Sequence, residues 1–108
     1  MARDGTVLIA GAGPVGLAAA VELTRRGVAL RIVDAGEGPT PAEQSRALAI
    51  NPTTLAILGP SGLSETLLAA GTTITGSDVV IDGRTALSLS FKSAHTPHPF
   101  MLSLPQGR

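Results

Sequence analysis

Three glycines near the start of the chain have the spacing of a phosphate-binding turn. Gly11, Gly13 and Gly16 fit the pattern G-x-G-x-x-G. In that pattern the first glycine permits a tight turn, the second lets the backbone approach a pyrophosphate, and the third lets a helix pack closely on a strand. Asp34 follows after about 20 residues, where a carboxylate can accept both hydroxyls of an adenosine ribose. These residue types at this spacing predict binding of an adenine dinucleotide.

The residues around the glycines have the pattern of a strand, a helix and a second strand. Residues 7–9 form a short apolar run, apolar residues then recur at helical spacing until Gly27, and a second apolar run ends at Asp34. The helix would direct its free N–H groups and the positive end of its dipole at the phosphates. This order favours a dinucleotide-binding unit over a flexible glycine turn. The expected cofactor contacts here are Gly11, Gly13, Pro14, Val15, Gly16, Asp34 and Ala35.

Two short helices are expected in the middle of the chain. Asn51 can cap the first, Pro52 suits its first turn, and Gly59 ends it. The second is expected over residues 63–70 and ends at Gly71. We expect both to pack on a sheet or its edge.

From Thr72 the apolar residues alternate with polar ones, which is typical of strands. Two runs, residues 74–81 and 87–91, are joined by Asp82-Gly83-Arg84, and Asp-Gly is the usual signal for a type I′ hairpin turn. Residues 101–104 are expected to form one more short strand. The predicted fold class is therefore α/β: a Rossmann-like βαβ unit with parallel strands, followed by a β-hairpin. So few strands leave the far edge of the sheet uncovered, and we expect an incomplete domain.

Composition excludes several function classes. Eight Lys and Arg balance eight Asp and Glu, so no basic face favours nucleic acid or a membrane surface. The uncharged run 5–21 is too short and too rich in glycine for a membrane span, and a cytoplasmic location is expected. The chain has no cysteine, which excludes disulfides, thiolate metal sites and the redox-active cysteine pair of flavin disulfide reductases. His95 and His98 lie in a loop broken by prolines, so we expect no metal site.

Several segments beyond the glycine motif resemble flavoprotein aromatic hydroxylases of the para-hydroxybenzoate hydroxylase type, including polyketide and phenol hydroxylases. They are the run Ser45–Leu58, then Gly62-Leu63 and Gly71, and finally Leu104-Pro105-Gln106. The Ser-Arg-Ala entry to a helix and the Leu-Pro-Gln segment are the more specific parts. The resemblance covers nearly the whole chain and corresponds to the N-terminal part of such enzymes.

This resemblance implies an FAD cofactor, NAD(P)H as its reductant and oxygen-dependent hydroxylation of a small aromatic substrate. It places Arg46 along the FAD and Gln106 near the ribityl chain, and it assigns the adenosine ribose to Asp34, where the family more often has glutamate. It also divides the chain into residues 1–72, the N-terminal part of an FAD-binding domain, and residues 73–108, the hairpin and the start of a substrate-side region. The later Gly-Asp segment that holds the flavin in this family is missing, so we expect a truncated and inactive fragment, with no acid or base identified.

Two other interpretations remain open at this stage. An NAD-dependent dehydrogenase-type domain would use the same glycines and Asp34, because both cofactors contain an ADP group; Arg46 and Gln106 favour flavin. A non-catalytic remnant would pair through its exposed sheet edge with a second copy, as a homodimer, or with another chain. Arg46 could also be a helix-entry residue that contacts only solvent or a nearby acid.

Overall fold

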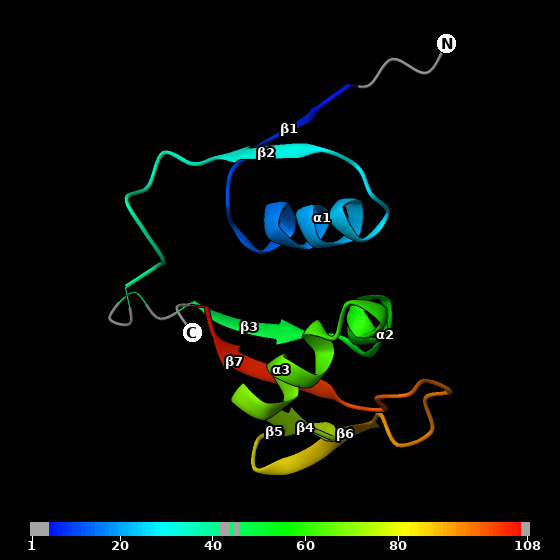
Figure 1. Cartoon of the computed structure of the whole chain (residues 1–108). Helices are drawn as coiled ribbons and strands as arrows, with labels where there is room; N and C mark the ends of the chain where they lie inside the picture. Colours follow the sequence, from blue (N-terminus) through cyan, green and yellow to red (C-terminus); the bar gives the residue numbers. More distant parts are fainter. Residues whose placement is uncertain (1–4, 42–43, 45, 107–108) are drawn as a thin grey trace. The chain divides into compact units, whose positions relative to one another are not determined.

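The computed structural model describes residues 5–41, 44 and 46–106. The chain divides into two compact units, Met1–Pro41 and Ala42–Arg108, and each is described by itself (Figure 1). No helix among the described residues is long and apolar enough to cross a membrane.

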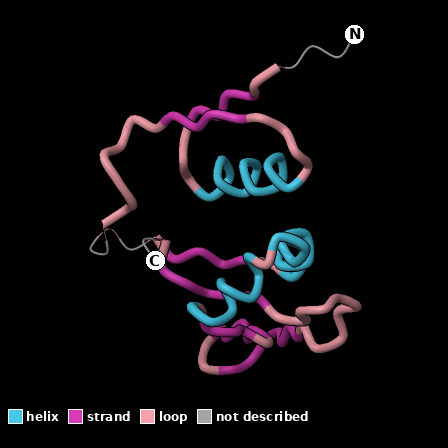
Figure 2. Tube along the Cα trace, viewed as in Figure 1, coloured by secondary structure: helices cyan, strands magenta, loops and turns pink. Residues whose placement is uncertain are grey.

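The first unit is a strand–helix–strand unit. Strand β1 (Val7–Ala10) is followed by helix α1 (Pro14–Arg25) and strand β2 (Leu30–Val33). The two strands pair in parallel, in a register that runs from Val7 opposite Leu30 to Ala10 opposite Val33. The predicted parallel βαβ unit is therefore confirmed (Figure 2).

Helix α1 begins and ends where its sequence predicts. Pro14 occupies the first turn, where a missing N–H costs nothing. At the other end Gly27 has φ +75°, its N–H donates to the carbonyl of Thr24 at 2.9 Å, and the N–H of Val28 donates to the carbonyl of Leu23 at 3.0 Å. This left-handed glycine terminates the helix and turns the chain toward β2.

The second unit is built on a three-stranded antiparallel sheet. Its strands are β3 (Ala47–Ile50), β4 (Thr72–Ile74) and β7 (Met101–Pro105), in the order β3-β7-β4. Helices α2 (Pro52–Leu58) and α3 (Leu63–Ala70), joined by the 3₁₀ turn η1 (Gly59–Ser61), connect β3 to β4. The core contains Leu55, Leu102 and Leu104, against which Leu48, Ile50, Leu67, Leu68 and Phe100 pack.

The two short helices match their predicted limits. The Asn51 side chain accepts a hydrogen bond from the N–H of Thr54 at 2.8 Å, which caps α2. The buried hydroxyl of Ser64 donates to the carbonyl of Leu55 and so joins α3 to α2. The predicted strand at residues 101–104 is confirmed as β7 and supplies the central strand of the sheet.

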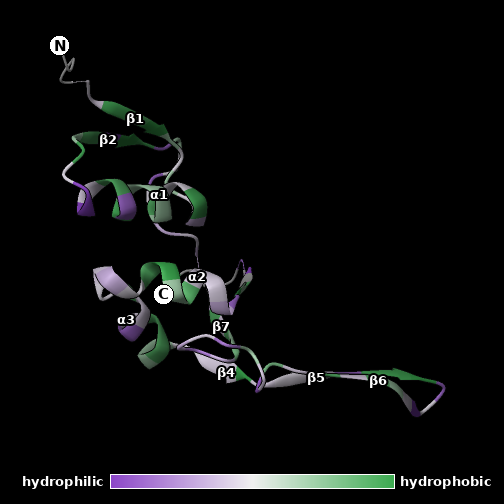
Figure 3. Ribbon diagram, turned by 90° about the vertical axis from the view of Figure 1, so that its right-hand side faces the viewer, coloured by the Kyte–Doolittle hydropathy of each residue, from purple (hydrophilic) through white to green (hydrophobic). Residues whose placement is uncertain are grey.

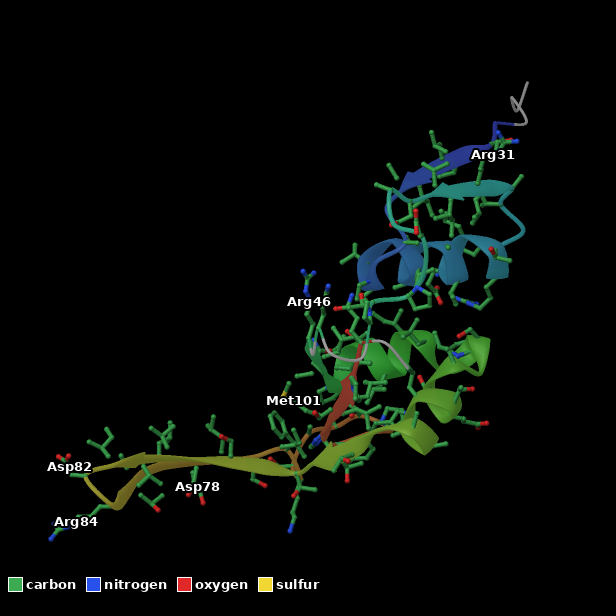
Figure 4. The ribbon with its side chains drawn as sticks, turned by 90° about the vertical axis from the view of Figure 1, so that its left-hand side faces the viewer. Arg31, Arg46, Asp78, Asp82, Arg84 and Met101 are labelled. Carbon is green, nitrogen blue, oxygen red and sulfur yellow. The ribbon has the colours of Figure 1, made fainter. Side chains whose placement is uncertain are left out.

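A β-hairpin extends from this unit. Strands β5 (Gly76–Ile81) and β6 (Arg84–Ser90) pair in antiparallel fashion, and both turn residues have positive φ, +49° at Asp82 and +74° at Gly83. Positive φ at both positions is the type I′ geometry that Asp-Gly predicts. Asp82 and Arg84 lie at the tip of the hairpin and Asp78 lies along it (Figure 4).

Two predictions for this unit need correction. The run from Thr72 to Ile81 is not one strand: it breaks at Thr75, because β4 pairs with β7 whereas β5 pairs with β6. The helix entry predicted around Arg46 is also wrong, because the residues that follow it form strand β3; Ser45 lies outside the described residues. Leu48 and Ile50 are half-buried on the core while Ala49 between them is exposed, which is the alternation of a strand.

Candidate functional site

The glycine loop between β1 and α1 makes a turn that needs glycine at its start. Gly11 has φ +108°, a conformation that side chains rarely permit, and its N–H donates to the carbonyl of Val33 at 2.7 Å. This bond ties the start of the loop to the end of β2. The tight turn expected of the first glycine is therefore present.

Gly16 is required by close packing of the first turn of α1. A Cβ atom at this position would lie 2.0 Å from the carbonyl oxygen of Gly11 and 3.2 Å from Cγ2 of Ile9. Neither the loop backbone nor the strand can move away without disturbing the turn. Only glycine lets the helix approach the loop so closely.

Neither backbone conformation nor packing within the protein requires glycine at position 13, in contrast to Gly11, which has a positive φ, and Gly16, which has no space for a side chain. A Cβ atom at Gly13 would meet nothing within 4 Å, and φ is an ordinary −76°. Gly13 caps α1 without a side chain, and no hydrogen bond runs from the N–H groups of Gly13, Val15 or Gly16 to another described residue. These groups and the helix dipole provide a site for an anion.

An open pocket of about 450 Å³ lies along this loop. The loop glycines, Pro14 and Val15 line it, together with Ala19 of α1. Val15 is 85% exposed, so it borders the pocket without closing it.

The Asp34 carboxylate lies at the end of β2 and is bound to backbone on both sides. Its Oδ2 accepts from the N–H of Ala12 at 2.6 Å, and its Oδ1 accepts from the N–H of Gly36 at 2.7 Å. These two bonds, the one from Ala12 first, hold the pKa of the carboxyl below its ordinary value. An ionised carboxylate has about four acceptor positions, so positions remain for ribose hydroxyls. Ala35 follows directly and is exposed.

Sequence reasoning missed the roles of Ala12 and Gly36. Both act through backbone N–H groups, which every residue except proline carries, so their side chains give no signal. The Asp-x-Gly sequence at 34–36 is typical of a local turn in which aspartate accepts from the N–H two residues on, and it could have identified Gly36.

Arg46 and Gln106 are brought together in the second unit. The N–H of Gln106 donates to the carbonyl of Arg46 at 3.1 Å, next to the pair Ala47 and Pro105 at the end of the β3–β7 ladder. Arg46 is exposed directly before β3 (Figure 4), and Gln106 is half-buried directly after β7. Two residues 60 positions apart in sequence therefore share one end of the sheet.

The two histidines have local partners. His95 Nδ1 lies 3.0 Å from the carbonyl oxygen of Ser93, and the His98 ring lies 5.9 Å from the Phe100 ring, centroid to centroid. Within the described residues no three His, Cys, Asp or Glu side chains are grouped as a metal would require.

Comparison with curated proteins finds several monooxygenases. The chain is 44% identical over 104 residues to 6-methylpretetramide 4-monooxygenase of Streptomyces rimosus, covering 94% of the chain and 18% of that protein. It is 34% identical over 102 residues to 12-dehydrotetracycline 5-monooxygenase/anhydrotetracycline 6-monooxygenase of Streptomyces rimosus subsp. rimosus, covering 94% of the chain and 19% of that protein. The chain thus spans about a fifth of the length of these relatives.

Solved structures and a family model agree with this result. The p-nitrophenol 4-monooxygenase PnpA from Pseudomonas putida DLL-E4 matches with a TM-score of 0.76 and 27% identity, covering 94% of this chain and 26% of its own. The flavin-dependent monooxygenase PieE, solved in complex with FAD and substrate, matches with a TM-score of 0.70 and 26% identity, covering 97% of this chain and 21% of its own. The family model described as FAD binding domain matches residues 4–108. The chain belongs to this FAD-binding domain family.

Proposed function

We propose that the chain forms the N-terminal FAD-binding part of a flavin-dependent monooxygenase that hydroxylates a small aromatic molecule with NAD(P)H as reductant. Support comes from the family match over residues 4–108 and from relatives that are named monooxygenases. A cytoplasmic location stays a prediction.

The residues of the glycine loop fit the ADP half of FAD. The observation that carries this assignment is the set of N–H groups at Gly13, Val15 and Gly16, which donate to no described residue at the start of α1. At Gly13 a Cβ atom would meet no protein atom within 4 Å, so a ligand can approach the backbone there. The open N–H groups at the start of α1 would donate to the pyrophosphate, and the Asp34 carboxylate would accept from the ribose hydroxyls.

The remaining roles are proposed from the family resemblance. Arg46 would lie along the cofactor and Gln106 would contact its ribityl region. Bound FAD supplies the redox chemistry of the reaction, and the residues of this chain bind and orient it. No residue is assigned as an acid or base. The proposed contacts are Gly11, Gly13, Pro14, Val15, Gly16, Asp34, Ala35, Arg46 and Gln106.

We also propose that the chain is divided by role between residues 72 and 73. Residues 1–72 would bind FAD, and the hairpin that follows would begin the substrate side. Strand β7 nevertheless pairs with β3 as well as with β4, so the sheet of the second unit contains residues from both segments.

We also propose that the chain self-associates through its hairpin. Val79 and Leu87 are paired across β5 and β6, and Leu89 lies two residues further along β6, so these side chains share one face. They are 43%, 52% and 51% exposed, and Figure 3 shows hydrophobic stretches on the hairpin. An exposed apolar face on a two-stranded sheet is a typical surface for packing against a second copy.

Cofactor binding is tested by comparing Gly13→Ala with Gly38→Ala. Both glycines have open space at the Cβ position and neither has a positive φ, so both variants should fold. Calorimetry with ADP and with FAD should show an affinity loss of about tenfold for Gly13→Ala, because its methyl group would meet the pyrophosphate. Gly38→Ala should bind like the parent. Equal binding by both variants would remove Gly13 from the site, and no binding of either ligand by the parent would contradict the proposed function.

A further inference from the structure

Asp34 lies where β2 meets the glycine loop, and it contacts both segments at once. Its Oδ2 accepts from Ala12, 22 positions earlier in the chain, and its Oδ1 accepts from Gly36 in the segment that follows β2. Ala12 lies between Gly11 and Gly13. One side chain therefore joins the loop before α1 to the loop after β2.

The glycine loop has few other hydrogen bonds to hold it. The N–H of Gly11 donates to the carbonyl of Val33 at 2.7 Å, and the N–H of Leu17 donates to the carbonyl of Gly13 at 2.9 Å. Gly11 has φ +108°, and glycine loses more conformational freedom on folding than any other residue. A further bond to Ala12, between the two glycines, therefore restricts the conformations of the loop. A charge-assisted bond of 2.6 Å is a strong one.

We propose that Asp34 is a positioning residue that holds the glycine loop in its ligand-ready conformation before any nucleotide binds. This role comes in addition to its ribose contact, and its link to nucleotide affinity rests on the proposed function. Because the carboxylate uses the N–H of Ala12, the N–H groups of Gly13, Val15 and Gly16 are the ones left for phosphate.

The Asp34→Asn variant distinguishes a role of the carboxylate as a hydrogen-bond acceptor from a role of side-chain shape alone. The amide has one oxygen instead of two, so it can accept from Ala12 or from Gly36 in this geometry, and its NH₂ group would face the other N–H. Asp34→Asn therefore breaks at least one bond at nearly constant shape. Asp78→Asn is the matched control, since Asp78 is an exposed carboxylate that accepts from the Ser88 hydroxyl at 2.6 Å in the other unit.

The first test is amide hydrogen exchange without ligand. In the parent chain the N–H of Ala12 should exchange at least about tenfold more slowly than that of Gly13, after correction for intrinsic rates. Asp34→Asn should remove this difference and Asp78→Asn should keep it. Equal rates at the two positions in the parent would overturn the proposal. That comparison needs no variant, so it decides even where Asp34→Asn does not fold.

The second test is calorimetry with ADP and with 2′,3′-dideoxy-ADP, which has no ribose hydroxyls. A positioning role predicts that Asp34→Asn binds the dideoxy compound about tenfold more weakly than the parent, the effect of losing one charge-assisted bond that orders the loop. A carboxylate that served only the ribose would leave this affinity unchanged or raise it, and that result would overturn the proposal. If the parent binds neither compound, the proposed function fails, and the exchange measurement still decides the positioning role.

Discussion

The N–H of Gln106 donates to the carbonyl of Arg46 at 3.1 Å, so two residues far apart in sequence face each other at one end of the β3–β7 ladder. Their positions continue the antiparallel register that pairs Ala47 with Pro105. The fold therefore places a cationic residue and an amide residue at the same end of this sheet, where both can contribute to one ligand site.

We expect Arg46→Ala to weaken FAD binding by about tenfold, the effect of losing one hydrogen bond from a charged group. Lys92→Ala is the matched control, because Lys92 is also an exposed cation of the second unit but belongs to no recognised motif. Flavin fluorescence titration measures both affinities, and the chain has no tryptophan or tyrosine to interfere. The same FAD affinity in both variants would contradict the role proposed for Arg46.

Gly16→Ala should destabilise the first unit by about 1–3 kcal/mol, the usual cost of inserting a methyl group where there is no space. The Cβ atom would lie 2.0 Å from the carbonyl oxygen of Gly11, which belongs to the backbone and cannot rotate away. Amide exchange of the β1 and α1 residues measures this loss. Gly38→Ala meets no atom within 4 Å, and exchange in this variant should match the parent.

Adenine nucleotides with a free 2′-hydroxyl should bind better than those with a 2′-phosphate. Asp34 carries a negative charge held by two backbone N–H groups, and it would repel a phosphate at the ribose. Calorimetry should therefore give a lower Kd for NAD than for NADP, and Asp34→Ala should abolish the preference. Equal affinity for the two nucleotides in the parent chain would remove Asp34 from the ribose role.

Local signals in the sequence predicted most element ends correctly. Asn51, Gly27 and the Asp82-Gly83 pair act within a few residues of themselves, and the structure confirms each. The pairing of β1 with β2 followed from the glycine motif, but the antiparallel pairings of β7 with β3 and β4 could not be predicted from local signals. Strand β3 is too short for its alternation to stand out, and it is stabilised by β7, which lies far along the chain. The hydrogen bond between the Ala12 N–H and Asp34 was also not predicted, because a backbone N–H is the same in every residue that has one and gives no sequence signal.

Acid should destabilise the first unit through Asp34. The N–H groups of Ala12 and Gly36 hold the pKa of this carboxyl below its ordinary value, so the stabilisation is fully present above about pH 3.9 and is lost as pH falls through the lower folded pKa. The stability difference between the parent and Asp34→Asn should therefore shrink as pH falls through that range. Urea unfolding at a series of pH values measures the difference.

The two arginines beside Glu22 lower the pKa of that carboxyl as well, the hydrogen bond from Arg25 contributing most. Glu22 is present in both proteins of this comparison, so its contribution cancels. A stability difference that stays constant down to the lowest pH would show that Asp34 does not change its protonation on unfolding.

Self-association should depend on the apolar face of the hairpin. Light scattering should show an apparent mass that rises with concentration for the parent, and Val79→Thr should shift this rise to higher concentration. The substitution keeps the shape of the side chain and adds a hydroxyl that is costly to bury between two copies. Val33→Thr is the matched control, because Val33 also lies in a strand and is 46% exposed, against 43% for Val79. If the hairpin face forms the interface, the apparent mass of Val33→Thr should rise with concentration as it does for the parent. A monomer at every concentration would contradict self-association, and an equal shift in both variants would exclude the hairpin face as its specific site.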